Sequence, residues 1–166
     1  GRADLFISKG NVDQMPSNAI KDPNNLLMQQ ADGTFREMGQ TAGLASTERG
    51  RGAALADFDG DGRLDVLVLN RRAPLEIYRN EIPNAGHWLA VSLLQPGGNR
   101  HAIGASVTVN GDMQRTIIGG GHAGGQAGPL HFGLGAATQA EITVEWPGGQ
   151  ITHHKTAANQ AITLSP

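Results

Sequence analysis

Residues 57–65 read Asp57-Phe58-Asp59-Gly60-Asp61-Gly62-Arg63-Leu64-Asp65, so four carboxylates fall within one short loop. Their negative charges repel one another in water, and a hard cation that accepts roughly six to eight oxygen ligands removes that cost. Gly60 and Gly62 allow the backbone to curl until alternate side chains point inward. The spacing therefore predicts a Ca²⁺ site, with Mg²⁺ or a solvated acidic turn as the alternatives. The expected ligands are Asp57, Asp59, Asp61 and Asp65, the backbone carbonyl of Arg63, and water.

The segments beside this loop favour strands. Ala53–Ala56 precedes it and Val66–Leu69 follows it, and both are short apolar runs. An EF-hand loop, which two helices flank, has Gly at its sixth position and Glu at its twelfth. Gly62 supplies the first requirement, but the twelfth position is Val68, inside an apolar run. The expected unit is therefore strand–loop–strand.

Part of this motif occurs twice. Gly1-Arg2-Ala3-Asp4 and Gly62-Arg63-Leu64-Asp65 share the pattern Gly-Arg-x-Asp, at an offset of 61 residues, and each precedes an apolar run. Such self-similarity indicates a repeat architecture, although so short a match also arises by chance. The first copy lacks the Asp-rich front of the loop. We therefore expect the chain to begin inside a truncated loop, and we expect Asp4 not to act as a calcium ligand.

Short strands and tight turns dominate the remainder, as expected for a chain with 24 Gly and 8 Pro. The candidates in residues 1–83 are Leu5–Ser8, Leu26–Gln29, Thr34–Glu37, Ala53–Ala56, Val66–Leu69 and Leu75–Arg79. Those in residues 84–166 are Trp88–Leu94, Ala105–Val109, Gln114–Ile118, Leu130–Phe132, Ile142–Glu145, Gln150–Thr152 and Ala161–Leu164. The predicted fold is all-β: about one and a half β-propeller blades in 1–83, then a small antiparallel β-sandwich or barrel in 84–166.

Composition limits the possible partners and chemistry. The formal net charge is −2 and no cluster of Lys and Arg forms a stripe, which disfavours nucleic acid. No apolar run approaches the roughly 18 residues that a membrane span needs. Cysteine is absent, so disulfides and thiol chemistry are excluded, while the cellular compartment stays open.

Longer motifs resemble two known families. The loop with its flank, residues 52–62, and the pieces Asn25-Leu26-Leu27 and Asp32-Gly33-Thr34-Phe35 resemble the FG-GAP/VCBS repeat of integrin-like propellers. The second half resembles the ASPIC/UnbV domain. Its matching pieces are Asn99-Arg100-His101-Ala102-Ile103-Gly104-Ala105, Leu130-His131-Phe132-Gly133-Leu134-Gly135, Val144-Glu145-Trp146-Pro147-Gly148-Gly149 and Ala158-Asn159-Gln160. His101 and Asn11-Val12-Asp13 depart from the usual patterns. The resemblance implies calcium, extracellular association such as cell adhesion, and a secreted, cell-surface or periplasmic location.

We interpret the chain as a non-catalytic binding or scaffolding module of a larger propeller protein. Its expected partners are an extracellular protein or glycan and the remaining propeller blades. The first alternative is the non-catalytic part of a carbohydrate-active, lyase-type propeller enzyme, because some calcium-bearing propellers of this repeat class are sugar lyases. The second is a fragment that completes an assembly and has no ligand of its own.

Three other features have plainer explanations. Gly119–Gly125 lacks the Gly-Lys-Ser/Thr ending of a phosphate loop, and we expect a flexible connection between strands. His153 and His154 would point to opposite faces of a strand, and the histidines do not suggest a metal site. Trp88 and Trp146 are expected in the core.

Overall fold

The computed structural model describes residues 2–11, 21–121 and 124–166, which form strands and connecting segments without a helix. Each predicted strand overlaps an observed one. In chain order the strands are β1 (Leu5–Ile7), β2 (Asn25–Gln29), β3 (Phe35–Glu37), β4 (Gly50–Ala56), β5 (Asp65–Asn70), β6 (Glu76–Tyr78), β7 (His87–Leu93), β8 (Ser106–Val109), β9 (Asp112–Arg115), β10 (Gly119–Gly121), β11 (Gly124–Gln126), β12 (Leu130–Gly135), β13 (Gln139–Glu145), β14 (Ile151–Ala157) and β15 (Gln160–Leu164). Among the described residues, none lies in a helix that could cross a bilayer.

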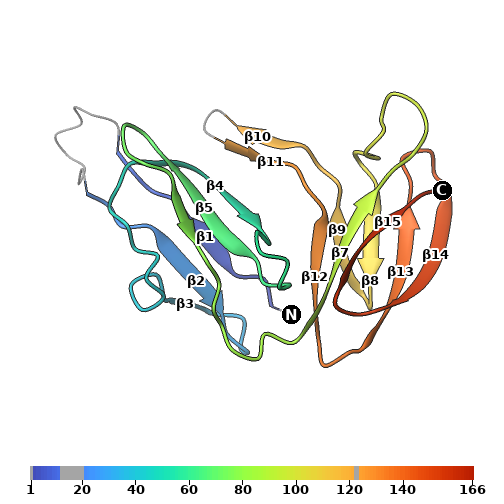
Figure 1. Ribbon diagram of the computed structural model, residues 1–166, viewed down its shortest axis with the longest axis horizontal. Helices are drawn as coiled ribbons and strands as arrows, with labels where there is room; N and C mark the ends of the chain where they lie inside the picture. Colours follow the sequence, from blue (N-terminus) through green and yellow to red (C-terminus); the bar gives the residue numbers. More distant parts are fainter. Residues whose placement is uncertain (1, 12–20, 122–123) are drawn as a thin grey trace.

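The N-terminal half consists of two antiparallel meanders (Figure 1), β1-β2-β3 and β4-β5-β6. The repeated Gly-Arg-x-Asp pattern ends at the start of a strand in both, because Asp4 directly precedes the edge strand β1 and Asp65 begins the middle strand β5. Each aspartate also accepts a backbone hydrogen bond from a residue at, or just beyond, the end of the neighbouring strand. Gln29 N–H donates to Asp4 Oδ1 at 2.8 Å, and Asn80 N–H donates to Asp65 Oδ1 at 2.8 Å. The sequence repeat is therefore also a structural one.

Both meanders carry apolar side chains on both faces. Successive side chains of a strand point to opposite sides, so Val68 of β5 faces away from Leu69. Val68 is fully buried, whereas Leu69 is 56% exposed and Ile77, on the neighbouring strand β6, is 59% exposed. In β1, Leu5 and Ile7 are also exposed. One face of each sheet is thus left largely uncovered.

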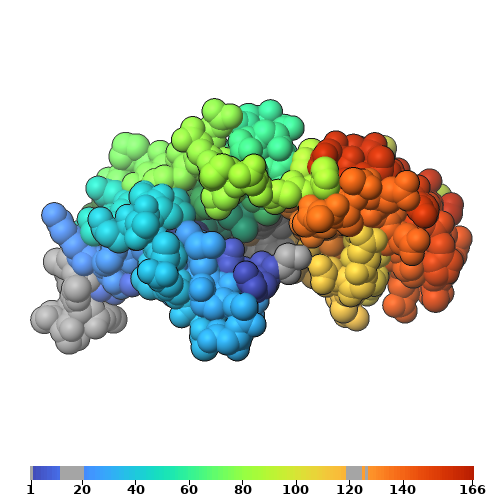
Figure 2. Space-filling model, turned by 90° about the horizontal axis from the view of Figure 1, so that it is seen from below, coloured from blue at the N-terminus to red at the C-terminus, as the bar shows by residue number. Residues whose placement is uncertain are grey.

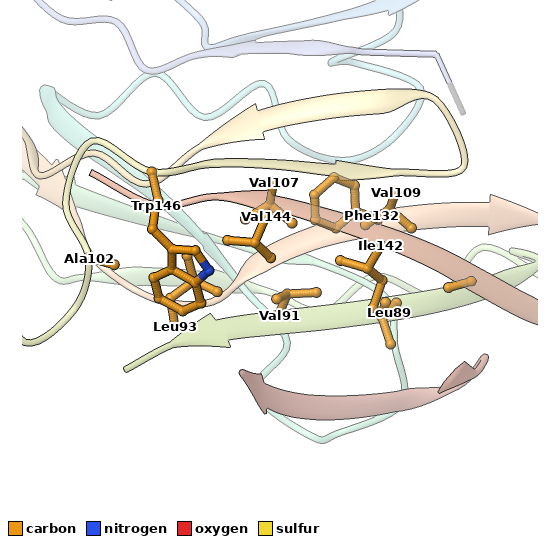
Figure 3. Packing of buried hydrophobic residues seen from close by; sticks show 12 residues of the cluster. Leu89, Val91, Leu93, Ala102, Val107, Val109, Phe132, Ile142, Val144 and Trp146 are labelled. Carbon is orange, nitrogen blue, oxygen red and sulfur yellow. The ribbon is translucent and has the colours of Figure 1, made fainter. Parts of the chain in front are cut away.

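The C-terminal half is a β-sandwich, as predicted. The sheet β12-β7-β15 packs against the sheet β14-β13-β8-β9. Figure 3 shows the buried cluster between them, to which β7 contributes Leu89, Val91 and Leu93 and β13 contributes Ile142 and Val144. The strands of the sandwich pair antiparallel except for β15, which runs parallel to β7.

Two segments differ from the sequence predictions. The strand expected at Gln114–Ile118 is instead β9, since Asn110 and Gly111 adopt positive φ angles of 49° and 95° and form a two-residue hairpin turn directly before it. The glycine-rich stretch expected to be a flexible connection contains the paired strands β10 and β11, and its residues 122–123 lie outside the described residues. A glycine-rich sequence lacks the side-chain alternation that indicates a strand, so it is predicted to be a loop. Its backbone can still form the hydrogen bonds of a strand pair.

The β10–β11 hairpin extends from the sandwich toward the N-terminal half, where β11 packs beside β4 (Figure 1). Figure 2 shows the blue-to-green N-terminal half meeting the orange and red sandwich along one side. The predicted division after residue 83 falls in the connection between β6 and β7. The two halves therefore share no sheet, but they are in contact through β11 and β4.

Candidate metal centre

The Asp-rich loop connects two hydrogen-bonded strands. Asp57 follows the last residue of β4, and Asp65 begins β5, so the antiparallel pairing of Ala56 with Asp65 closes the base of the loop. Asp57, Asp59 and Asp61 each place a carboxylate oxygen within 4.8 Å of the others. No other such group of His, Cys, Asp or Glu occurs in residues 2–11, 21–121 and 124–166.

Asp57 organises the loop through backbone hydrogen bonds. Its Oδ1 accepts from the N–H groups of Gly60 at 2.8 Å and Asp61 at 3.0 Å, and its Oδ2 accepts from Gly62 N–H at 2.8 Å. Gly60 and Gly62 have φ angles of 75° and 87°, in the left-handed region that glycine tolerates. These turns bring Asp57, Asp59 and Asp61 together.

Two arginines supply positive charge to the cluster. The guanidinium of Arg63 contacts Asp61, and Arg79 Nε lies 2.7 Å from Asp59 Oδ2. Sequence reasoning did not anticipate Arg79, which lies far along the chain. The pairing of Val66 with Tyr78 carries Arg79 back to the loop, so a correct strand register would have revealed it.

Asp65 lies outside the group of three and is almost fully buried, at 2% exposure. Its Oδ2 accepts from Phe58 N–H at 3.0 Å, while its Oδ1 accepts from Asn80 N–H. Arg63 Nε donates to the Asn80 carbonyl at 2.7 Å. Asp65 thus holds both the loop and the segment after β6 in place through hydrogen bonds. The ligand roles of Asp65 and of the Arg63 carbonyl stay predictions.

The donor set fits a hard divalent cation. All the converging ligand atoms are carboxylate oxygens, which Ca²⁺ and Mg²⁺ both bind, and Ca²⁺ accepts irregular geometry more readily. The four loop aspartates carry two more charges than Arg63 and Arg79 balance. A bound cation would draw Asp57, Asp59 and Asp61 inward in place of the guanidinium groups and would cross-link the loop that joins β4 to β5.

The C-terminal half contacts this loop at Gly62. His131 Nε2 lies 2.9 Å from the Gly62 carbonyl oxygen, so Nε2 carries the hydrogen that is donated. The ring of His131 stacks on Trp88, with centroids 5.8 Å apart and an interplanar angle of 7°. A Cβ atom on Gly62 would overlap the indole of Trp88. The loop therefore packs against an aromatic pair.

These contacts correct one sequence expectation. Trp146 is buried in the sandwich core as predicted, at 3% exposure. Trp88 is only half-buried, because its ring covers Gly62 instead of entering the core. Neither Trp88 nor His131 was expected at the metal loop, and no local pattern could have indicated it, because the contact joins residues far apart in the chain.

Comparison with known proteins finds a family match within each half. A family model described as "FG-GAP-like repeat" matches residues 1–68, and one described as "ASPIC and UnbV" matches residues 95–166. The chain is 27% identical over 165 residues to Cartilage acidic protein 1 of Mus musculus, an alignment that covers 95% of this chain and 25% of that protein. The protein of the same name from Xenopus tropicalis is 31% identical over 131 residues, which cover 74% of this chain and 20% of that protein. The chain thus spans about a quarter or less of the length of these relatives.

Proposed function

The chain joins an FG-GAP-like repeat to an ASPIC and UnbV domain, and from this we propose that it is a non-catalytic, calcium-binding scaffold module of an extracellular protein. The ion would be held by Asp57, Asp59 and Asp61, with Asp65 and the Arg63 carbonyl completing the set. Its role would be structural, because it would fix how β4 and β5 diverge at the loop.

One observation carries this proposal: three carboxylates converge within 4.8 Å at a loop pre-shaped by two glycines. Like charges placed so closely raise the free energy of the loop unless cations offset them. Arg63 and Arg79 offset part of that charge. We expect Ca²⁺ to compete with these two side chains for the carboxylate oxygens.

The partners we propose include further propeller blades. The exposed side chains of Leu69 and Ile77 lie on one sheet, and those of Leu5, Ile7 and Phe35 lie on the other. A sheet with an uncovered apolar face is stabilised when another layer covers it. Neighbouring blades of the same parent protein would supply that layer on each side.

We place the module outside the cytoplasm, in a secreted, cell-surface or periplasmic protein. The name of the relatives refers to cartilage, a tissue rich in extracellular matrix. The proposed calcium site also fits this location. Calcium-binding modules of extracellular proteins bind the ion with Kd on the order of 10⁻⁴–10⁻³ M. The partner recognised by the intact protein would be an extracellular protein or glycan.

Thermal melting in calcium and in chelator tests the proposal. At about 100 times Kd the ion would stabilise the fold by roughly 2.7 kcal/mol, which raises the melting temperature of a domain of this size by several degrees. Asp59→Ala should remove most of that rise. Asp22→Ala is the matched control, because Asp22 also pairs with a cation, Lys9, at 2.7 Å but lies outside the loop. Identical melting of the unmutated chain in both conditions would refute the structural calcium site.

A further inference from the structure

An unbroken series of contacts leads from the carboxylate cluster into the sandwich. Gly62 N–H donates to Asp57 Oδ2 at 2.8 Å, and the Gly62 carbonyl accepts from His131 Nε2 at 2.9 Å. His131 in turn stacks on Trp88. One peptide segment therefore touches a predicted ligand on one side and the C-terminal half on the other.

The aromatic pair is itself fixed to the sandwich. Trp88 belongs to β7 and His131 to the neighbouring strand β12, and Ala90 pairs with His131 in that sheet. The backbone of Trp88 exchanges hydrogen bonds with Asn159 at 3.2 and 2.7 Å. Gln114 donates to the His131 carbonyl at 2.7 Å. A movement of Gly62 must therefore displace the rings or break its contact with them.

We propose that Trp88 and His131 are positioning residues of the metal loop, so that cation binding at Asp57, Asp59 and Asp61 is coupled to docking of the C-terminal half. The inference rests on the proposed calcium site and goes beyond it, because it makes the site dependent on both halves. The docked rings hold Gly62 where its N–H supports Asp57. By thermodynamic reciprocity, the cation then tightens the docking by the same factor by which the rings tighten cation binding.

Gly62 shows why the coupling is steric as well as polar. Gly60 and Gly62 both have positive φ angles, so an added Cβ strains either backbone. Only at Gly62 does the added Cβ overlap Trp88, whereas nothing lies within 4 Å at Gly60. Gly60→Ala is thus a matched control for Gly62→Ala: it shares the backbone strain and lacks the collision with the indole.

The first experiment follows the indole N–H signals of the unmutated chain by NMR during a calcium titration. The chain has two tryptophans, and Trp146 Nε1 donates to Thr152 Oγ1 at 3.0 Å inside the sandwich. We expect the Trp88 signal to shift in step with calcium binding while the Trp146 signal stays in place. Assignment uses Trp88→Phe. A Trp88 signal that does not move while calcium binds would overturn the inference.

The second experiment measures calcium affinity by calorimetry. Trp88→Ala and His131→Ala should each weaken binding at least about fivefold, the lower end of typical coupling between sites. His131→Gln should restore much of the loss, because its amide can still donate to the Gly62 carbonyl. Gly62→Ala should weaken binding more than Gly60→Ala in the unmutated chain, and the two should become equal in the Trp88→Ala background.

The outcomes separate the coupling from the calcium site itself. If calorimetry detects no calcium binding in the unmutated chain, both the proposed function and the inference fail. If calcium binds with the same affinity in the unmutated chain, Trp88→Ala and His131→Ala, the calcium site stands and only the coupling is refuted.

Discussion

The two halves bury apolar surface to very different extents. The sandwich encloses a cluster of twelve buried side chains between its sheets. Among residues 2–11 and 21–83, the buried apolar side chains are Leu44 and Val68, and several large ones are exposed. The sandwich can therefore be stable on its own packing, whereas the propeller-like half depends more on hydrogen-bonded carboxylates such as Asp65 and on contacts from outside its sheets.

Two isoleucines give the sharpest test of this contrast. Ile142 in β13 is 2% exposed and Ile77 in β6 is 59% exposed. We expect Ile142→Ala to lower the free energy of unfolding by roughly 2–5 kcal/mol, because it removes buried methyl groups and leaves a cavity. Ile77→Ala should change it by less than about 0.5 kcal/mol. Urea unfolding measures both. Similar losses for the two variants would show that the contrast between the halves is wrong.

In the N-terminal half, the buried carboxylate of Asp65 should matter more for folding than any exposed apolar side chain. Its two oxygens hold the N–H groups of Phe58 and Asn80. Asp65→Ala leaves these donors without their acceptor, and hydrogen bonds to charged groups contribute roughly 1.5–3 kcal/mol each. Urea unfolding in chelator isolates this effect from calcium.

Asp59→Ala is the matched comparison, since Asp59 is more exposed and pairs with Arg79 at the surface. In chelator we expect Asp59→Ala to be close to neutral, because exposed ion pairs contribute at most about 1 kcal/mol. Equal losses for Asp59→Ala and Asp65→Ala would contradict the distinction between an exposed aspartate of the loop and a buried one that stabilises the fold.

The smallest expected effect concerns Tyr78, the single tyrosine of the chain, which reports on the N-terminal half alone. Burial raises the pKa of Tyr78 above its ordinary value, and the Glu76 carboxylate adds to the shift. The folded state therefore favours the neutral phenol. Its contribution to stability is complete below pH of about 10 and disappears as pH rises through the higher folded-state pKa.

A phenolate absorbance titration measures this shift directly. Glu76→Gln should move the midpoint back toward the ordinary value, because it removes the nearby negative charge. In the Trp88→Phe background, where Trp146 is the remaining tryptophan and reports on the sandwich, the emission should stay unchanged across the same titration. A midpoint equal to that of the urea-unfolded chain would contradict the burial of Tyr78.

Local patterns predicted the loop, most of the strand positions and the sandwich. The aspartate spacing and the glycines of residues 57–65 determine the shape of the loop within a few residues. The alternation of apolar residues that indicates a strand is likewise a short-range pattern. The parallel pairing of β15 with β7, the approach of Arg79 to Asp59, and the stacking of Trp88 on His131 all join distant segments. Such contacts depend on register and on the packing of two sheets, which the alternation of apolar residues along one strand does not encode.

The position of β7 determines where the boundary of an expressed C-terminal fragment should lie. β7 lies between β12 and β15 and supplies Leu89, Val91 and Leu93 to the core. Yet it falls between the two ranges that the family models match, which end at residue 68 and begin at residue 95. A fragment cloned from residue 95 would lose the strand shared by β12 and β15 and expose two unpaired strand edges, which are templates for aggregation. An expression boundary in the β6–β7 connection, before His87, would retain the whole sandwich together with Trp88.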